Sequence, residues 1–254
     1  MEFISIEDAI ARDGLRLIIV RNTPSPWGQA AKAMMEYKGL DFALAGQEPG
    51  GENAELLAWS GVNSGPVVAW NDEPPINRWD DILMLIERLA PGKPLLPQER
   101  AGRAKALGLA HEICGELGLG WNRRLELFHP AMQMEQPPPP VQSMARKYRY
   151  NPEEAARAVE RQVATLEFLH AELETQRARG CAYFVGDLLS AVDFYWAAFS
   201  TIIKLPPAGD VPVPDGFRPM FEILTPELDQ AMTPLLLEHR DRMLRDHFRI
   251  PMEF

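Results

Sequence analysis

The segment that most constrains the fold is residues 15–42, in which a buried strand runs directly into a helix. Residues 15–21 begin LRLIIV, an apolar run rich in β-branched side chains that has the length of a strand. A polar turn follows, and Pro26 suits the first turn of a helix because its missing N–H would be unpaired there anyway. The next stretch is rich in alanine and methionine and ends at Gly39, a natural helix stop. These residues predict a strand, a turn that carries a hydroxyl group, and a helix.

Short strands and helices alternate up to about residue 90. Further strands are predicted at residues 41–45, 66–70 and Ile76, and helices at residues 53–60 and 79–89. Together with the first unit they make residues 15–90 a βαβαββα domain. Residues 1–14 are interpreted as an N-terminal extension with one helical turn at residues 6–11.

A segment rich in proline and glycine separates this domain from the rest of the chain. It covers residues 91–98, within the sequence APGKPLLPQ, and it interrupts both the helical and the strand patterns. From residue 99 to residue 254 the pattern is helical almost throughout, which predicts an all-helical second domain (99–254). Its long helices are expected at residues 98–117, ended by Gly118, and at residues 152–177.

Two other segments of the second domain have distinct signals. The four prolines at residues 137–140 favour a polyproline II conformation, so this region is predicted to be a spacer between helices, with the wall or lid of a cleft as the alternative. Residues 186–199 are predicted to form a loop and a buried helix. Ser190 and Asp193 have the S-x-x-D spacing of a capping box at the start of that helix. This spacing is a structural signal and carries no function by itself.

The composition argues against several classes of function. The net charge of −10, from 26 basic and 36 acidic residues, repels phosphate backbones and disfavours a nucleic-acid partner. Cys114 and Cys181 belong to no CxxC motif or Cys/His cluster, and the five histidines show no metal-ligand spacing, so no metal site is expected. The chain has no apolar run of membrane-spanning length and no signal-peptide pattern at its start, so no membrane contact and a cytoplasmic location are expected.

Several segments, in this order, resemble the cytosolic glutathione transferases over roughly residues 15–248. The resemblance rests on Ser25-Pro26-Trp27 before an alanine-rich helix, on Gly65-Pro66-Val67-Val68, and on Phe184-Val185-Gly186-Asp187 followed by the Ser190 and Asp193 pair. It implies an α/β plus all-α protein, with a thioredoxin-like N-terminal domain and a helical C-terminal domain. It also implies a homodimer, a glutathione site on the first domain, and a pocket for a small hydrophobic electrophile between the domains.

The turn before the first long helix is where this family would activate a thiol. A helix N-terminus carries partial positive charge, which stabilises a thiolate and lowers the pKa of the thiol. Ser25 would donate a hydrogen bond to the sulfur of glutathione and would therefore be the catalytic residue, with Asn22 and Thr23 as nearby substitutes. The alternative is that Ser25 only caps the helix. The turn contains no cysteine, which argues against thiol–disulfide exchange.

The resemblance places the contacts to glutathione at this turn, at the expected cis-proline and at the start of the helix predicted at residues 79–89. They are Thr23, Trp27, Gly65, Pro66, Val67, Arg78 and Trp79. The backbone beside Pro66 would pair with the cysteinyl part of glutathione like an added strand. Arg78 and Trp79 stand where the family has Glu or Gln followed by Ser, the pair that grips the γ-glutamyl carboxylate. Arg78 could bind a carboxylate in another geometry, or it could be a solvated residue at a helix start.

Several aromatic and polar residues of the second domain are further candidates for lining the cleft, although helix packing explains them equally well. They are Trp121, Asn122, Arg123, Arg124, Tyr148 and Tyr150, the last two beside Arg146 and Lys147.

The residues leave three functions open. The first is an enzyme that activates the glutathione thiol for attack on a hydrophobic electrophile, in conjugation, dehalogenation, ether cleavage or isomerisation. The second is a binding or interaction protein of the same fold that has lost glutathione chemistry, which the Arg78-Trp79 pair favours. The third is an enzyme that uses a different acidic cosubstrate, with Arg78 as its anchor. The turn at Ser25 favours the first.

Overall fold

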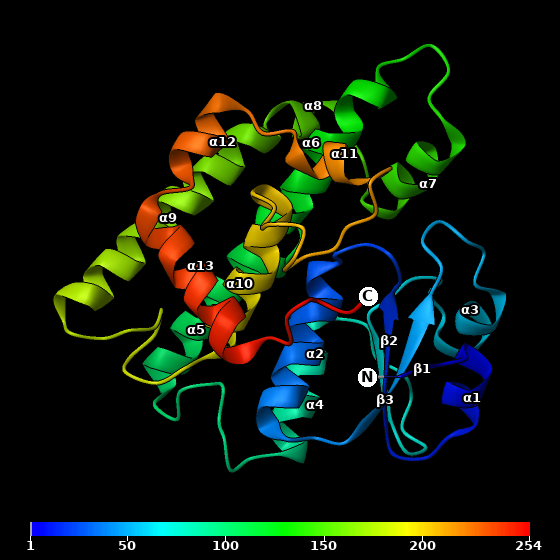
Figure 1. The fold of residues 1–254 in the computed structure, drawn as a ribbon, viewed down its shortest axis with the longest axis horizontal. Coiled ribbons are helices and arrows are strands. Elements are labelled where there is room, and N and C mark those ends of the chain that lie inside the picture. Colours follow the sequence, from blue (N-terminus) through cyan, green and yellow to red (C-terminus); the bar gives the residue numbers. More distant parts are fainter. Residues whose placement is uncertain (1) are drawn as a thin grey trace.

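The computed structural model describes residues 2–254 and consists of an N-terminal part built on a four-stranded sheet and an all-helical C-terminal part (Figure 1). The elements of the N-terminal part are β1 (Phe3–Ile4), α1 (Ile6–Ala11), β2 (Leu15–Val20), α2 (Pro26–Lys38), β3 (Phe42–Gln47), α3 (Ala54–Ser60), β4 (Val67–Trp70) and α4 (Trp79–Leu89). This arrangement confirms the expected fold class of a thioredoxin-like domain followed by a helical domain.

The sheet has the strand order β1-β3-β2-β4, with β4 antiparallel to β2 and the other pairs parallel. Side chains alternate along β2 because successive residues of a strand point to opposite faces. Leu17 and Ile19 enter the large core with α2 and α4, whereas Ile18 packs with Leu56 of α3 on the other face. The sheet is therefore a middle layer between two pairs of helices, with α1 and α3 on one side (Figure 1).

Two residues of the segment expected to be an N-terminal extension, Phe3 and Ile4, belong to this sheet. β1 pairs in parallel with β3, so that Phe3 is opposite Leu44, and the helix at Ile6–Ala11 has the expected bounds. A two-residue strand is too short to have a sequence pattern of its own. It forms here because the open edge of β3 supplies its hydrogen bonds. The strand expected at Ile76 is a single bridge to Val68.

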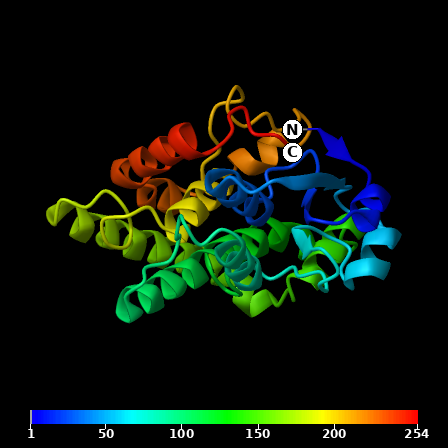
Figure 2. The ribbon, with the colours of Figure 1, turned by 90° about the horizontal axis from the view of Figure 1, so that it is seen from below.

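Nine helices of the described chain form the C-terminal part. They are α5 (Arg100–Cys114), α6 (Leu119–Met132), α7 (Pro139–Lys147), α8 (Pro152–Ala156), α9 (Ala158–Ala178), α10 (Ala191–Ile203), α11 (Arg218–Glu222), α12 (Pro226–Ala231) and α13 (Pro234–His247). Figure 2 shows that this helical part extends to one side of the sheet. Helix α10 is at its centre, with every residue buried, and packs against α2, α5 and α13.

The capping box predicted at the start of α10 is present. The carboxylate of Asp193 accepts hydrogen bonds from the backbone N–H of Ser190 (2.9 Å) and from its hydroxyl (2.7 Å). The carboxylate also accepts from the backbone N–H of Phe184 (3.1 Å). Asp193 therefore ties the loop before the helix to its first turn.

Two long helices are shorter than their patterns predicted. The first ends at Cys114, and Gly115 and Gly118 form the turn into α6, where Gly118 is the N-cap. A Cβ atom at Gly118 would lie 2.7 Å from the carbonyl oxygen of Glu112, so this turn has room only for glycine. The helix expected at residues 152–177 is divided at Arg157 into α8 and α9.

The proline run is divided between the connection from α6 to α7, which holds Pro137 and Pro138, and the start of a helix, where the prediction of a spacer is wrong. Pro138 has extended backbone angles, and α7 begins at Pro139, where a proline fits because the first helical N–H groups have no partner within the helix. The segment that follows was expected to be a poor helix former, yet it forms α7 up to Lys147. This helix forms part of a cavity wall.

Candidate active site

A cavity of about 370 Å³ lies between the N-terminal domain and helices α5, α6 and α7. Residues from both domains line it: Ser25, Trp27, Ser64, Gly65, Pro66, Asn77, Arg78, Trp79, His111, Cys114, Gly115, Glu116, Trp121, Lys147 and Tyr148. Six of the eight residues proposed from the sequence are among them, and Thr23 and Val67 are not. The fold therefore brings the turn before α2, the Gly65–Pro66 loop and the start of α4 to one place.

Ser25 is at the N-cap position of α2 but does not cap the helix. Its backbone is extended and Pro26 is the first helical residue, yet the serine side chain makes no capping hydrogen bond. Its hydroxyl has no hydrogen-bond partner within residues 2–254, although Ser25 is half-buried at the cavity wall. The side-chain hydrogen bond that a capping role would use is therefore absent from the described structure. The hydroxyl can donate to a group in the cavity, beside the positive end of the helix.

The Gly65–Pro66 peptide bond is cis, at the edge of the same cavity. Gly65 lies against β2 so closely that a Cβ atom there would be 2.7 Å from the carbonyl oxygen of Ile18. Its N–H donates to the side-chain oxygen of Gln47 (3.3 Å). The next residue, Val67, is fully buried and its side chain packs on the other face of the sheet, with Ile18. The Val67 side chain therefore lies away from the cavity, which Ser64, Gly65 and Pro66 line.

Arg78 and Trp79, at the start of α4, have different surroundings. Arg78 is exposed, and its guanidinium pairs with Asp80 (2.7 Å) and, more weakly, with Asp81 (3.5 Å). These bonds raise the pKa of Arg78. Burial raises the pKa of Asp80, but the hydrogen bond and charge of Arg78, with nearby backbone N–H groups, outweigh it and lower that pKa overall. The Arg78 charge is thus already balanced by carboxylates of its own helix.

Trp79 is half-buried and forms part of the cavity wall. Its ring packs edge-on against Tyr195, with centroids 5.6 Å apart, and its backbone carbonyl accepts a hydrogen bond from the Tyr195 hydroxyl. The His111 ring of α5 is also near Trp79, with ring centroids 6.3 Å apart. Trp79 therefore presents an aromatic surface to the cavity.

Trp27 joins the two domains at the cavity floor. Its indole N–H donates to the backbone carbonyl of Cys114 (3.0 Å), and its ring packs edge-on against Phe199 at 4.7 Å. The indole donor is therefore used within the protein. Thr23 is half-buried outside the cavity, with its hydroxyl 3.5 Å from the carbonyl oxygen of Arg21.

Two groups at the cavity wall keep their protons because burial raises their pKa. The thiol of Cys114 is buried and its pKa lies well above the ordinary value, so this cysteine is no thiolate nucleophile. Burial also raises the pKa of Tyr148, against the opposing effect of Arg124. Tyr148 packs edge-on against Trp121 at 5.0 Å. With Trp27 and Trp79, these rings give the cavity four aromatic walls.

Trp121 and Tyr148, for which the sequence left both cleft lining and helix packing open, line the cavity. Asn122 and Arg123 are fully buried in helix packing, where Arg123 donates to the carbonyl of Ile202. Sequence reasoning missed the remaining wall residues: Ser64, Asn77, His111, Cys114, Gly115, Glu116 and Lys147. Ser64 is next to the expected cis-proline, which could have identified it. The α5 residues had no signal, because only the packing of α5 on the first domain brings them there.

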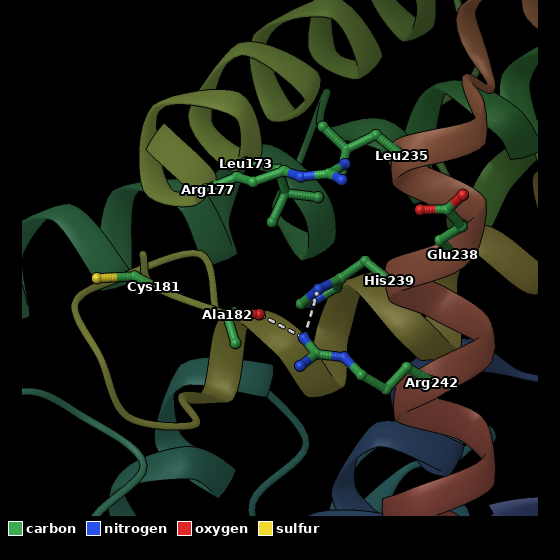
Figure 3. A pocket seen from close by; sticks show the side chains of 8 residues that line it. All are labelled: Leu173, Arg177, Cys181, Ala182, Leu235, Glu238, His239 and Arg242. Atoms are coloured by element: carbon green, nitrogen blue, oxygen red, sulfur yellow. Dashed lines mark hydrogen bonds between the residues drawn. The ribbon is translucent and has the colours of Figure 1, made fainter. Parts of the chain in front are cut away.

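A second, smaller cavity of about 230 Å³ lies between α9, α13 and the loop after α9 (Figure 3). There the side chain of Arg242 donates to Nδ1 of His239 (2.9 Å) and to the carbonyl of Ala182. Because a guanidinium can only donate, Nδ1 must accept, and the imidazole carries its proton on Nε2. This Nε2 is 2.9 Å from the carboxylate of Asp193. The His239 ring therefore extends the capping box to α13.

Within residues 2–254 no group of three or more His, Cys, Asp and Glu side chains could hold a metal ion. Over the same residues, no helix combines the length and apolar character needed to cross a bilayer.

No protein-family model matches the sequence, and no curated protein matches it significantly. Solved structures are similar. A glutathione S-transferase from Methylobacillus flagellatus with glutathione bound has a TM-score of 0.64 at 12% identity, covering 93% of this chain and 100% of that chain. A glutathione S-transferase from Methylobacterium radiotolerans, in complex with glutathione sulfonate, has a TM-score of 0.62 at 17% identity, covering 94% of this chain and 97% of that chain.

A maleylacetoacetate isomerase from Methylobacterium extorquens, with bound malonate and glutathione, has a TM-score of 0.58 at 19% identity, covering 90% of this chain and 91% of that chain. The present chain therefore has the fold of the glutathione transferases, as the resemblance of its sequence implied.

Proposed function

We propose that this protein is a glutathione transferase-like enzyme, in which Ser25 activates the thiol of glutathione for attack on a hydrophobic electrophile. One observation carries the proposal: the Ser25 hydroxyl is at the N-terminus of α2, on the cavity wall, with no hydrogen-bond partner in the described chain. A serine that only stabilised the helix would use its oxygen to cap it. Bound glutathione in the solved structures of the same fold supports the choice of thiol.

The chemistry follows from the surroundings of Ser25. The positive end of α2 favours the anionic form of a nearby sulfur, and a hydrogen bond from the hydroxyl favours it further. The pKa of the bound thiol would therefore fall below its ordinary value of about 8.5. The thiol gives up its proton to solvent, and the thiolate forms a carbon–sulfur bond with the electrophile; with a chloronitrobenzene the carbon–chlorine bond breaks and chloride leaves. Ser25 remains unmodified because it donates a hydrogen bond and does not form a covalent bond.

The cosubstrate would lie along the Gly65–Pro66 loop. Gly65 and Pro66 both line the cavity, and the N–H of Gly65, which donates to the side-chain oxygen of Gln47, becomes available if Gln47 moves. Trp27 and Trp79 would contact the peptide as walls. The four aromatic rings favour an electrophile with a flat or apolar body, since burying such a surface against aromatic rings is favourable.

The test is to measure the pKa of the bound thiol, using the ultraviolet absorbance of the thiolate as the signal. Glutathione should bind saturably in a calorimetric titration, and its thiol should titrate below the ordinary value. Ser25→Ala should raise that pKa towards the free value and lower turnover of a chloronitrobenzene by about 10- to 100-fold, the loss of one hydrogen bond to a charged group.

Ser143→Ala is the matched control, because it removes an exposed hydroxyl on α7 outside this cavity. It should leave the thiol pKa and turnover unchanged. Unchanged turnover in Ser25→Ala would refute thiol activation by this residue. Absence of glutathione binding at millimolar concentration would favour the alternative of a non-catalytic binding protein of this fold, or of an enzyme with another acidic cosubstrate.

A homodimer in the cytoplasm belongs to the same proposal, on the strength of the fold. Sedimentation equilibrium should give twice the chain mass of 28.6 kDa. A mass of one chain at micromolar concentration would contradict the dimer without affecting the chemistry at Ser25.

A further inference from the structure

Helix α7 carries one lysine, Lys147, across to the loop that precedes the cis peptide bond. Its ammonium group donates a hydrogen bond to the hydroxyl of Ser64, 83 residues earlier in the chain. Both residues line the cavity that contains Ser25. Although Lys147 as a whole is exposed, its charged end is held at this wall, on the domain opposite Ser25.

Three residues with a full charge line the cavity, and two of them are already paired. Arg78 is held by the carboxylates of the first turn of α4, and Glu116 pairs with Arg149 (3.1 Å). Lys147 has no carboxylate within ion-pairing distance among residues 2–254, and its hydrogen-bond partner Ser64 is neutral. Lys147 is therefore the cavity-lining cation, within the described chain, whose charge is not balanced.

The other groups around Lys147 make its charge unfavourable when no anion is bound. Arg124 of α6 is a like charge, Tyr148 beside it is neutral, and the loop of residues 61–66 contains no charged residue. Burial, followed by the charge of Arg124, lowers the pKa of Lys147 to about 8. A carboxylate next to the ammonium group would offset both effects.

We propose that Lys147 and Ser64 form a carboxylate-binding subsite, which holds an acidic end of the thiol cosubstrate while its sulfur lies at Ser25. The inference rests on the proposed function and identifies the group that replaces the missing carboxylate grip at the start of α4. The ammonium group supplies the charge, and the Ser64 hydroxyl, which accepts from Lys147, can donate its own proton to the carboxylate. The helical domain thus completes a site that the first domain leaves without a free cation.

The probe is S-methylglutathione, which keeps both carboxylates but has no thiol to activate. Its affinity, measured by calorimetry, therefore reports the subsite independently of Ser25 chemistry. Lys147→Met should weaken binding by about 10- to 100-fold, the loss of a charge-assisted hydrogen bond. Lys147→Arg should restore part of the affinity, and Ser64→Ala should cause a smaller loss than Lys147→Met.

Arg146→Met is the matched control, since it removes the same charge from the preceding, exposed residue, which does not line this cavity. It should bind like the wild type. Thermal unfolding of each variant checks that the fold is intact. Equal affinity of Lys147→Met and the wild type would overturn the proposal.

The pH dependence gives a second readout. The wild type should bind more weakly as the pH rises above about 8, because the free ammonium group loses its proton and no longer attracts the carboxylate. Lys147→Met should lack this component, so that any remaining change comes from the ligand's own amino group. A loss of affinity with pH that is identical in both proteins would also overturn the subsite.

Failure of the subsite differs from failure of the proposed function. Weakened S-methylglutathione binding by Lys147→Met would support the subsite. If the thiol pKa of glutathione bound to the wild type also equalled that of free glutathione, thiol activation would be refuted. Unchanged S-methylglutathione binding by Lys147→Met would refute the subsite, while a raised thiol pKa in Ser25→Ala would still support thiol activation. A wild type that binds neither glutathione nor S-methylglutathione would overturn both.

Discussion

Gly120 shows how closely single side chains approach each other where the two domains meet. A Cβ atom at this position of α6 would lie 2.4 Å from the Phe199 ring and 3.2 Å from the Trp27 ring. Both rings are held in place. Phe199 belongs to the fully buried α10, and the Trp27 indole N–H donates a hydrogen bond to the backbone carbonyl of Cys114. Neither can move aside without disturbing the cavity floor.

Gly120→Ala should therefore destabilise the protein by about 1–3 kcal/mol, the usual effect of overpacking a dense interior. Urea denaturation measures the free energy of unfolding. Gly108→Ala is the control, because this exposed glycine of α5 has nothing within 4 Å of an added Cβ. Alanine there should stabilise the helix by up to about 1 kcal/mol. A stable Gly120→Ala would show that the two rings are not fixed.

Arg78 illustrates how a charged residue can line a cavity and yet have its charge balanced. Because Asp80 and Asp81 neutralise its guanidinium at the surface, Arg78→Ala should lower glutathione affinity by no more than about threefold. Calorimetric titration, side by side with Lys147→Met, makes the comparison. A tenfold or greater loss in Arg78→Ala would instead make Arg78 the carboxylate anchor.

At the scale of elements, Asp193 connects three segments of the helical domain. Its carboxylate accepts from the loop before α10, from Ser190 at the N-cap and from His239 of α13 (Figure 3 shows His239 with Arg242). Since the residue is fully buried, removing the carboxylate leaves several donors without a partner.

Asp193→Ala should lower the free energy of unfolding by about 3–5 kcal/mol, the range for breaking a buried charged network. Ser190→Ala removes one member of the capping box and should cost about 1 kcal/mol. Both values come from urea denaturation monitored by circular dichroism. If the two variants lost equal stability, the bonds from Phe184 and His239 would contribute nothing beyond the cap.

At the scale of the whole molecule, the charge of Lys147 affects both ligand binding and folding. Burial and Arg124 lower its pKa to about 8 in the folded protein, against about 10.4 in an unfolded chain. Between these values the unfolded chain binds more protons, so stability rises with pH through this window. Below about pH 8 the charged ammonium disfavours the folded state.

Lys147→Met should therefore be modestly more stable than the wild type at neutral pH, because solvent around the exposed side chain screens part of the effect. The difference should shrink as the pH approaches 10, where the wild type has lost the charge. Urea denaturation at both pH values tests this. A stability difference that does not change with pH would refute the lowered pKa.

Local patterns predicted many elements correctly because their signals are local. The helix at 79–89, the buried helix after Ser190 and the strand starting at Leu15 follow from periodicity, capping residues and apolar runs. The errors occurred where partners distant in sequence decide: β1 exists because β3 offers an edge, and α7 because its prolines stand at a helix start within a packed wall.

The candidate site divides in the same way. The sequence by itself determined the fold class and part of the first domain's contribution to the cavity, because Ser25, Gly65 and Pro66 are at turns with strong local signals. Only the tertiary structure decided that Ser25 leaves its hydroxyl unused and that Arg78 is neutralised. It also brought Lys147 to Ser64, since contacts between residues so far apart in the chain depend on how the two domains pack.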